Sequence, residues 1–119
     1  MRVMIIGASS DRRKFGNKAV RAYLRQGETV LPVNPNESAI EGQPAWANVA
    51  DVPGPIDRAL FYVPAEVGLA IIGQLAQRGD VGEVWLNPGA ESDALIARAK
   101  SLGFDPITAC AIVDIGEMP

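Results

Sequence analysis

Short apolar runs alternate with longer segments of helical periodicity along the whole chain. Five of these runs predict β-strands, at residues 3–6, 29–33, 57–63, 82–86 and 104–108. Strands separated by helices are typical of βαβ units, in which the strands pair in parallel. The pattern therefore predicts an α/β protein in three layers, with a five-stranded parallel sheet, right-handed crossovers and helices on both faces.

Three segments between these strands have the apolar spacing of amphipathic helices. Their inward-facing residues are expected to be Val20, Tyr23 and Leu24 in 17–26, Val67, Ala70, Ile71 and Leu75 in 64–78, and Leu95, Ala99 and Leu102 in 93–102. Asn17 is the predicted N-cap of the first helix, and Pro64 suits the first turn of the second. Residues 35–56 are rich in Pro, Gly and Asn, which predicts a connection with one short helical turn near 46–50.

Length and composition are those of one globular domain covering residues 1–119. Apolar residues make up 48% of the chain and charged residues 21%. The net charge of −3 argues against a general nucleic-acid binder, which usually carries a basic excess. No apolar run approaches the ~18 residues that span a bilayer, and no signal-peptide pattern is present, so we expect no membrane partner.

The residue types that are rare or missing exclude several chemistries. The chain has no histidine, which removes histidine bases, phosphohistidine and imidazole metal ligands, and no Cys, Asp or Glu cluster has metal-ligand spacing. Cys110 is the single cysteine, so no disulfide forms within the chain and a cytoplasmic location is expected. The apolar neighbours of Cys110 favour a buried structural thiol. Glu91 and Asp93 lie at a predicted helix start, where they stabilise the helix dipole.

The segment between the first strand and the first helix carries the candidate chemistry. Gly7 allows a tight turn, and Gly16 opens the helix, whose unpaired N–H groups favour an anion. Ser9 and Ser10 add hydroxyl groups, and Lys14 adds a positive charge. The segment therefore predicts a cradle for phosphate. The spacing matches neither Gly-x-Gly-x-x-Gly nor a Walker motif, so an ordinary turn stays open as the alternative.

Positive charge is concentrated around the same segment. Six of the eleven basic residues lie between positions 12 and 25: Arg12, Arg13, Lys14, Lys18, Arg21 and Arg25. Arg12 and Lys14 belong to the loop and are candidates to meet a phosphate. Arg21 and Arg25 suit a solvated helix face equally well.

The other predicted strands also end in small or turn-forming residues. Ligands of parallel sheets bind beyond the carboxyl ends of the strands, which are occupied here by Asn34-Pro35, Val63-Pro64 and Asn87-Pro88-Gly89. NAD-binding folds usually place Asp or Glu after the second strand to bind the ribose. Asn34 stands at that place and has no carboxylate, which weakens an NAD interpretation.

Five segments carry a resemblance to a known family, in order and with matching spacing: residues 6–11, 14–17, 32–36, 40–42 and 85–91. In these segments the chain resembles the small CoA-binding domain proteins, which are related to the CoA-binding domain of the succinyl-CoA synthetase alpha subunit. The resemblance implies a five-stranded Rossmann-like sheet that binds the ADP portion of coenzyme A or an acyl-CoA.

The same resemblance implies a set of binding residues. The diphosphate site would consist of Gly7, Ala8, Ser9, Ser10, Lys14, Phe15, Gly16 and Asn17. Asn34 and Pro35 would lie beside the adenosine. The rest of the pocket would be lined by Val63, Pro64, Asn87, Pro88 and Gly89.

No catalytic constellation accompanies this cradle, and the synthetase chemistry needs a phosphorylated histidine that the chain lacks. The sequence therefore favours a non-catalytic carrier, sensor or accessory protein over an enzyme. One alternative is an NAD(P)-binding oxidoreductase or redox-sensing domain, for which Tyr62 is the candidate near a strand end. Another is a ligand-free interaction subunit on a nucleotide-binding scaffold. A homodimer is expected only because symmetric dimers are common.

Overall fold

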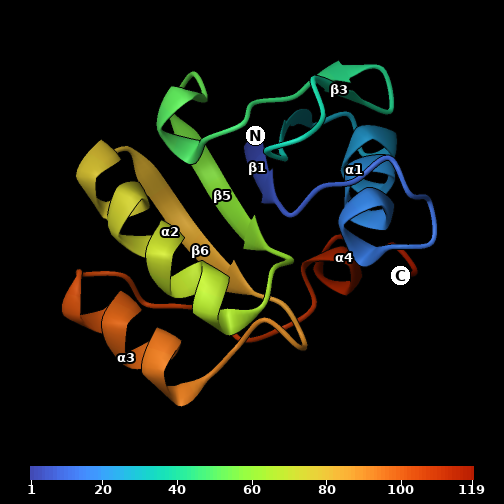
Figure 1. Ribbon diagram of the computed structural model, residues 1–119. Coiled ribbons are helices and arrows are strands. Elements are labelled where there is room, and N and C mark those ends of the chain that lie inside the picture. Colours follow the sequence, from blue (N-terminus) through green and yellow to red (C-terminus); the bar gives the residue numbers. More distant parts are fainter.

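A computed structural model describes all of residues 1–119 and contains a four-stranded parallel sheet (Figure 1). In chain order its elements are β1 (Arg2–Ile6), α1 (Phe15–Arg25), β2 (Thr29–Val33), β3 (Ala39–Ile40), β4 (Gln43–Pro44), a 3-10 turn η1 (Val49–Asp51), β5 (Ile56–Phe61), α2 (Ala65–Arg78), β6 (Val81–Leu86), α3 (Asp93–Ser101) and α4 (Ala111–Asp114). The sheet has the order β2-β1-β5-β6, and β3 and β4 form a separate antiparallel hairpin. The predicted Rossmann-like α/β class is confirmed.

The predicted fifth strand at residues 104–108 is wrong. Only Ile107 pairs with the sheet, through one parallel bridge to Trp85, and its N–H donates to the Val84 carbonyl at 2.9 Å. The N–H of Phe104 instead turns back to the carbonyl of Ala99 at the end of α3. Pro106 has no N–H to donate. The segment therefore touches the edge of β6 without extending the sheet.

The opposite edge of the sheet, β2, is also covered by a short bridge. Trp46 donates its N–H to the carbonyl of Pro32 at 3.0 Å, and the N–H of Asn34 donates back to the Trp46 carbonyl at 3.0 Å. Pro32 itself has no donor to offer along this edge. Each outer strand thus meets a few residues of irregular chain rather than a further strand.

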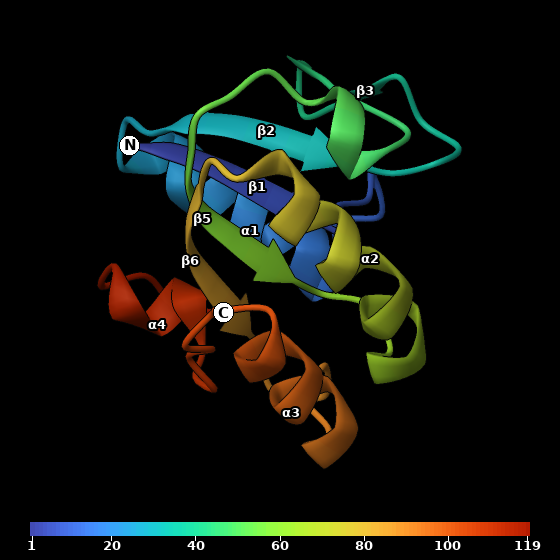
Figure 2. The same cartoon turned by 90° about the vertical axis from the view of Figure 1, so that its left-hand side faces the viewer.

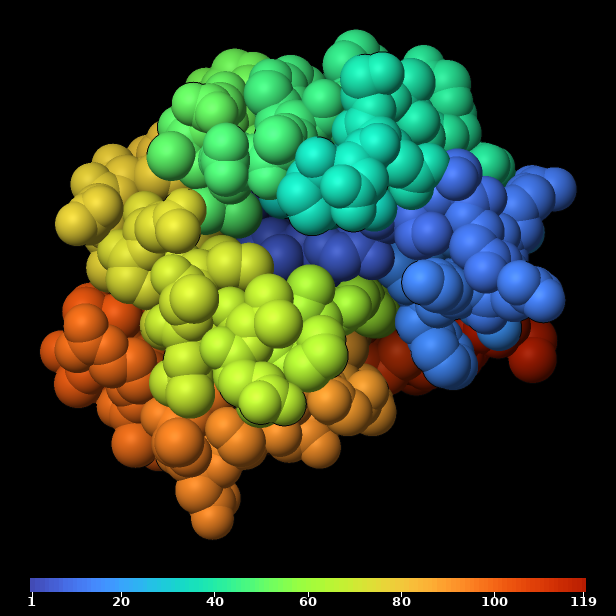
Figure 3. Space-filling view, in the orientation of Figure 1, coloured from blue at the N-terminus to red at the C-terminus, as the bar shows by residue number.

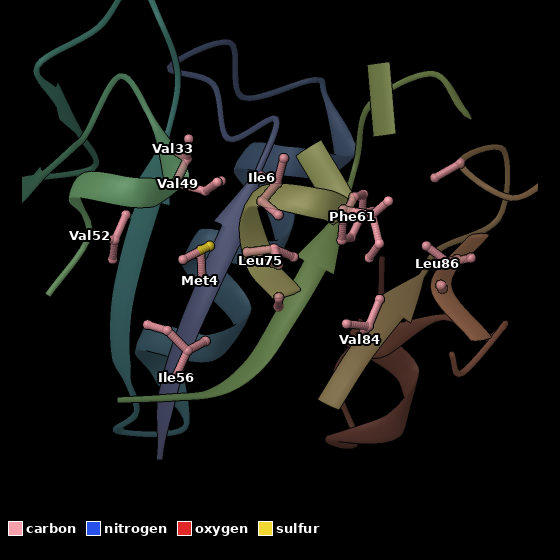
Figure 4. Close-up of a cluster of buried hydrophobic side chains, with 14 of the residues drawn as sticks. Met4, Ile6, Val33, Val49, Val52, Ile56, Phe61, Leu75, Val84 and Leu86 are labelled. Carbon is pink, nitrogen blue, oxygen red and sulfur yellow. The ribbon is translucent and has the colours of Figure 1, made fainter. Parts of the chain in front are cut away.

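Two hydrophobic clusters lie on opposite faces of the sheet, one under α1 and α4 and the other under α2 and α3 (Figures 1 and 2). Side chains alternate along β1, so that Met4 and Ile6 belong to the second cluster and Val3 and Ile5 to the first. Figure 4 shows Leu75 of α2 among the side chains of the second cluster. Because both faces are covered, the strands are apolar on both sides.

The buried face of α2 differs from the predicted one. Val67 is 44% exposed and Ala70 is exposed, whereas Ile72 is fully buried. Gly68 explains the rotation, because a Cβ there would lie 2.9 Å from Cδ2 of Leu95. The helix presents its smallest residue where α3 approaches, and periodicity alone does not reveal that contact.

Candidate functional site

A pocket opens at the carboxyl edge of the sheet between β1 and β5. The chain leaves β1 towards α1 on one face and leaves β5 towards α2 on the other, so the two loops separate. An open pocket of about 580 Å³ occupies the space between them. In Figure 3 the dark-blue atoms of the first residues lie at the bottom of a hollow between later segments. The fold thus places the pocket at the switch in strand order.

Most of the predicted site residues line this pocket. The lining includes eleven of them: Gly7, Ala8, Ser9, Lys14, Phe15, Gly16, Asn34, Val63, Pro64, Pro88 and Gly89. Tyr62, which the sequence suggested only for the oxidoreductase alternative, and Ala90, which was not predicted, also line it. The sequence signal for Tyr62 was the end of the third predicted strand, which was placed two residues too late. Four segments that lie far apart in the sequence are thus brought together by the ends of parallel strands.

Four predicted residues lie outside the lining: Ser10, Asn17, Pro35 and Asn87. Asn17 and Asn87 are almost fully buried, at 0% and 2% exposure. Ser10 is exposed and donates its N–H to the carboxylate of Glu37. Pro35 lines a separate pocket beside the first one.

In the loop of residues 7–14, which we term the β1 loop, backbone carbonyl groups accept hydrogen bonds from side chains outside the loop. The Nδ2 of Asn17 donates to the Ser9 carbonyl at 2.8 Å, and the Nδ2 of Asn34 donates to the Ala8 carbonyl at 2.9 Å. Arg21 donates to the Oδ1 of Asn17 and to the Arg12 carbonyl. Asn17 is therefore a brace for the loop, and its predicted role as N-cap is wrong, because the N-cap is Lys14.

Four backbone N–H groups in and next to this loop are unpaired, whereas those of Ser10, Asp11, Arg13 and Lys14 have partners. Those of Ala8, Ser9, Phe15 and Gly16 donate to no group of the protein, and all four residues line the pocket. Phe15 and Gly16 form the first turn of α1, where the helix dipole adds partial positive charge. Lys14 is the one charged residue in the lining. These groups can together bind an anion such as a diphosphate.

Glycine at position 16 allows α1 to begin directly against the β1 loop. A Cβ at Gly16 would overlap the carbonyl oxygen of Gly7 and lie 3.2 Å from the Cα of Ala8. Gly7 has φ of 89°, and a Cβ there would overlap the carbonyl oxygen of Tyr62. Both glycines therefore serve close backbone packing around the pocket.

The loop of residues 87–92, which we term the β6 loop, forms the opposite wall. Asn87 donates its Nδ2 to the Phe61 carbonyl at 3.1 Å, and its Oδ1 accepts from the N–H of Ala111 at 2.9 Å. The N–H of Gly89 donates to Glu91, and that of Ala90 donates to the Asn87 carbonyl. Asn87 thus ties β5, β6 and α4 together, and the N–H groups of Gly89 and Ala90, which line the pocket, are engaged within the loop.

The pocket contains no acid–base pair. Tyr62 has a buried hydroxyl without a hydrogen-bond partner, and burial raises the pKa of this phenol far above its ordinary value. The phenol therefore stays protonated at neutral pH. Cys110 is half-buried and does not line the pocket. No group of three or more Cys, Asp or Glu side chains converges to hold a metal ion.

A second, apolar pocket of about 290 Å³ adjoins the first and shares Gly7 and Val63 with it. Pro35, Val67 and Ile71 also line it, from the β2 end and from α2. The exposed face of α2 thus contributes to an apolar recess beside the anion-binding groups.

Among the helices, none has the length and hydropathy needed to cross a bilayer.

Comparison with known proteins identifies relatives of the chain. The family described as "CoA binding domain" matches residues 1–116. The alpha subunit of acetate–CoA ligase [ADP-forming] II from Pyrococcus furiosus is 32% identical over 88 residues, which are 73% of this chain and 19% of that protein. Acetate–CoA ligase [ADP-forming] II from Archaeoglobus fulgidus is also 32% identical, over 73% of this chain and 13% of the ligase. The chain thus spans about a fifth or less of these curated relatives.

Solved structures agree with this assignment. A conserved hypothetical protein from Pyrococcus furiosus superimposes with a TM-score of 0.87 at 31% identity, covering 95% of this chain and 97% of that one. The dinucleotide-forming acetyl-coenzyme A synthetase 1 of Ca. Korarchaeum cryptofilum, in complex with phosphate and ADP, superimposes with a TM-score of 0.76 at 29% identity. That match covers 88% of this chain and 25% of the synthetase.

Proposed function

The chain belongs to the CoA-binding domain family, and from this premise we propose that it binds coenzyme A or an acyl-CoA, with the diphosphate at the β1 loop. One observation carries the proposal: the unpaired N–H groups of Ala8, Ser9, Phe15 and Gly16 surround a pocket whose one charged lining residue is Lys14. No carboxylate belongs to that lining. A diphosphate supplies the negative charge and the acceptor oxygens that these groups lack.

The two ends of the ligand have different surroundings in this proposal. The adenine ring occupies the apolar pocket beside Pro35, Val63 and Ile71, which adjoins the diphosphate site at Gly7. The pantetheine arm runs in the other direction, along Pro88 and the rest of the β6 loop. Apolar and small side chains there offer contact area without fixing a particular acyl group.

We infer a carrier, sensor or accessory role from the lack of catalytic side chains in the pocket lining. The lining has no carboxylate, thiol or imidazole to act as nucleophile or general base, and the Tyr62 phenol stays protonated. We therefore propose that residues 1–119 act as one domain that holds the ligand without transforming it. The larger relatives are ligases, and this chain corresponds to only a fifth or less of their length.

Thermal unfolding with and without ligand tests the proposal. At a CoA concentration 100 times Kd, binding adds about 2.7 kcal/mol of stability, or roughly 10 °C in Tm for a domain of this size. NADH, NADPH and ATP serve as comparison ligands. A shift with CoA that exceeds theirs supports the proposal. A shift with NADH alone would favour the oxidoreductase alternative, and no shift with millimolar CoA would refute CoA binding.

A matched pair of variants locates the site in the same assay. Ser9→Asp places a carboxylate within the β1 loop and should abolish the CoA-induced shift through charge repulsion. Ser101→Asp at the exposed end of α3 makes the same change far from the pocket and should leave the shift intact. Equal shifts in both variants would place the ligand elsewhere.

A further inference from the structure

Glu37 lies beside the pocket on the turn that follows β2. Its Oε2 accepts a hydrogen bond from the N–H of Ser10 at 3.0 Å and another from the Nδ2 of Asn34 at 3.3 Å. Asn34 lines the main pocket and Pro35 lines the apolar pocket. Glu37 itself lines neither pocket, but its carboxylate is hydrogen-bonded to Asn34 of the main pocket and lies two residues after Pro35 of the apolar one, next to the proposed adenosine position.

The carboxylate is ionised and keeps free acceptor capacity. The hydrogen bond from Ser10, together with the charge of Lys14, lowers the pKa of Glu37. Its Oε1 accepts no hydrogen bond from the protein. Glu37 therefore offers a negatively charged acceptor at neutral pH.

The neighbouring guanidinium groups are engaged with other carboxylates. Arg12 pairs with Glu41 at 3.4 Å, and Arg13 pairs with Asp11 at 3.0 Å. Lys14 lines the diphosphate position instead. Both arginines of the β1 loop thus already face a carboxylate, although their side chains are exposed.

We propose that Glu37 determines ligand specificity, by accepting a hydrogen bond from a ribose hydroxyl and by disfavouring a phosphate on that ribose. The proposal rests on CoA-type binding as argued above. A carboxylate after the second strand binds ribose hydroxyls in dinucleotide-binding folds, and Glu37 supplies that carboxylate three residues beyond Asn34. Coenzyme A carries a 3′-phosphate on its ribose, and 3′-dephospho-CoA carries a hydroxyl there. The protein therefore binds 3′-dephospho-CoA at least as tightly as CoA.

Isothermal titration calorimetry of the full chain with CoA and with 3′-dephospho-CoA tests this specificity. Glu37→Gln removes the charge while its amide oxygen still accepts from Ser10 and Asn34. This variant should tighten CoA binding about fivefold relative to 3′-dephospho-CoA, as expected for two charges a few ångströms apart in water. Asp105→Asn is the control, since it removes an exposed carboxylate that makes no hydrogen bond or ion pair and lies after α3, and it should leave the ratio of the two Kd values within about twofold.

Each outcome of the titrations decides the matter. A wild-type protein that binds CoA more tightly than 3′-dephospho-CoA would overturn the role of Glu37. So would a Kd ratio that Glu37→Gln leaves unchanged, or one that Asp105→Asn changes equally. Failure of both ligands to bind any of the three proteins would instead refute the proposed function itself, on which the role of Glu37 depends.

Discussion

The β1 loop and the β6 loop form opposite walls of one pocket, yet their backbones are hydrogen-bonded in opposite ways. In the β1 loop, carbonyls are held by Asn17 and Asn34, and the N–H groups of Ala8 and Ser9 are unpaired, as are the first two N–H groups of α1, which follows. In the β6 loop, the N–H groups of Gly89 and Ala90 are engaged with Glu91 and Asn87. Both loops contain Gly and are braced by Asn side chains, which come from α1 and the β2 end for the β1 loop and from Asn87 itself for the β6 loop.

The comparison teaches that similar turn compositions can produce different recognition surfaces. A loop fixed through its carbonyls keeps its donors for a ligand, and so it can bind an anion. A loop that satisfies its own donors provides a neutral wall. The asparagine side chain decides which occurs, through the backbone group that it contacts. Four substitutions test this difference, in order of decreasing expected effect.

Gly16→Val should have the largest effect, because its side chain would overlap the Gly7 carbonyl and push α1 away from the β1 loop. We expect a loss of about 3 kcal/mol or more in unfolding free energy and no measurable CoA binding. Urea unfolding and calorimetry measure the two effects. Gly73→Ala is the control, since nothing lies within 4 Å of its Cβ, and it should stabilise α2 by about 0.5–1 kcal/mol. Wild-type affinity in Gly16→Val would contradict the packing argument.

Asn87→Ala should come next and should act on stability rather than on affinity. It leaves the buried Phe61 carbonyl and Ala111 N–H without partners, at a cost of about 3 kcal/mol in unfolding free energy. Tryptophan fluorescence during urea unfolding measures the change. Asn36→Ala removes an exposed amide that makes no side-chain hydrogen bond, and it should be neutral. A large loss of CoA affinity in folded Asn87→Ala would make this residue a direct contact.

Lys14→Ala should weaken CoA binding about tenfold, or about 1.4 kcal/mol, and leave the fold intact. The lost interaction is a charge-assisted contact with the diphosphate, so the difference from wild type should shrink at high salt. Titrations at two salt concentrations measure it. Lys100→Ala on the exposed face of α3 is the matched control. Equal affinities of the two variants would remove Lys14 from the site.

Glu91→Ala should have the smallest effect. It frees the N–H of Gly89 in the β6 loop but leaves the Asn87 turn in place. We expect CoA affinity to change by less than about twofold, because surface contacts of this kind contribute little. A fivefold or larger gain in affinity would show that the β6 loop can also become an anion site, and that the two walls differ less than we infer.

The sequence predicted the parts of the molecule that depend on local pattern. The alternation of strands and helices gave the class, and the small residues at strand ends gave most of the pocket lining, because parallel strands bring their carboxyl ends to one edge. The fifth strand was over-predicted, since apolar residues at 104–108 do not reveal that Phe104 bonds back to α3. The N–H of Phe104 could bond either to the sheet or to the end of α3, and only the tertiary fold determines which of the two it contacts.

The roles of individual polar residues were less predictable. The sequence predicted that Asn17, Asn34 and Asn87 contact the ligand. In the structure each of these side chains donates a hydrogen bond to a backbone carbonyl. The sequence pattern did not indicate Glu37, which lies three residues after the position where a ribose-binding acid is usual. The hydrogen-bond partner of such an amide or carboxylate can be identified only once the fold has brought together loops that are far apart in the chain.

The two outer strands have a consequence for association between chains. Pro32 interrupts the donors along β2, and Trp46 and Ile107 occupy part of each margin of the sheet. A second molecule therefore finds no long, unbroken row of backbone partners to continue the sheet. The architecture resists strand addition, and with it one common route to fibrous aggregation, so any self-assembly must use side-chain surfaces instead.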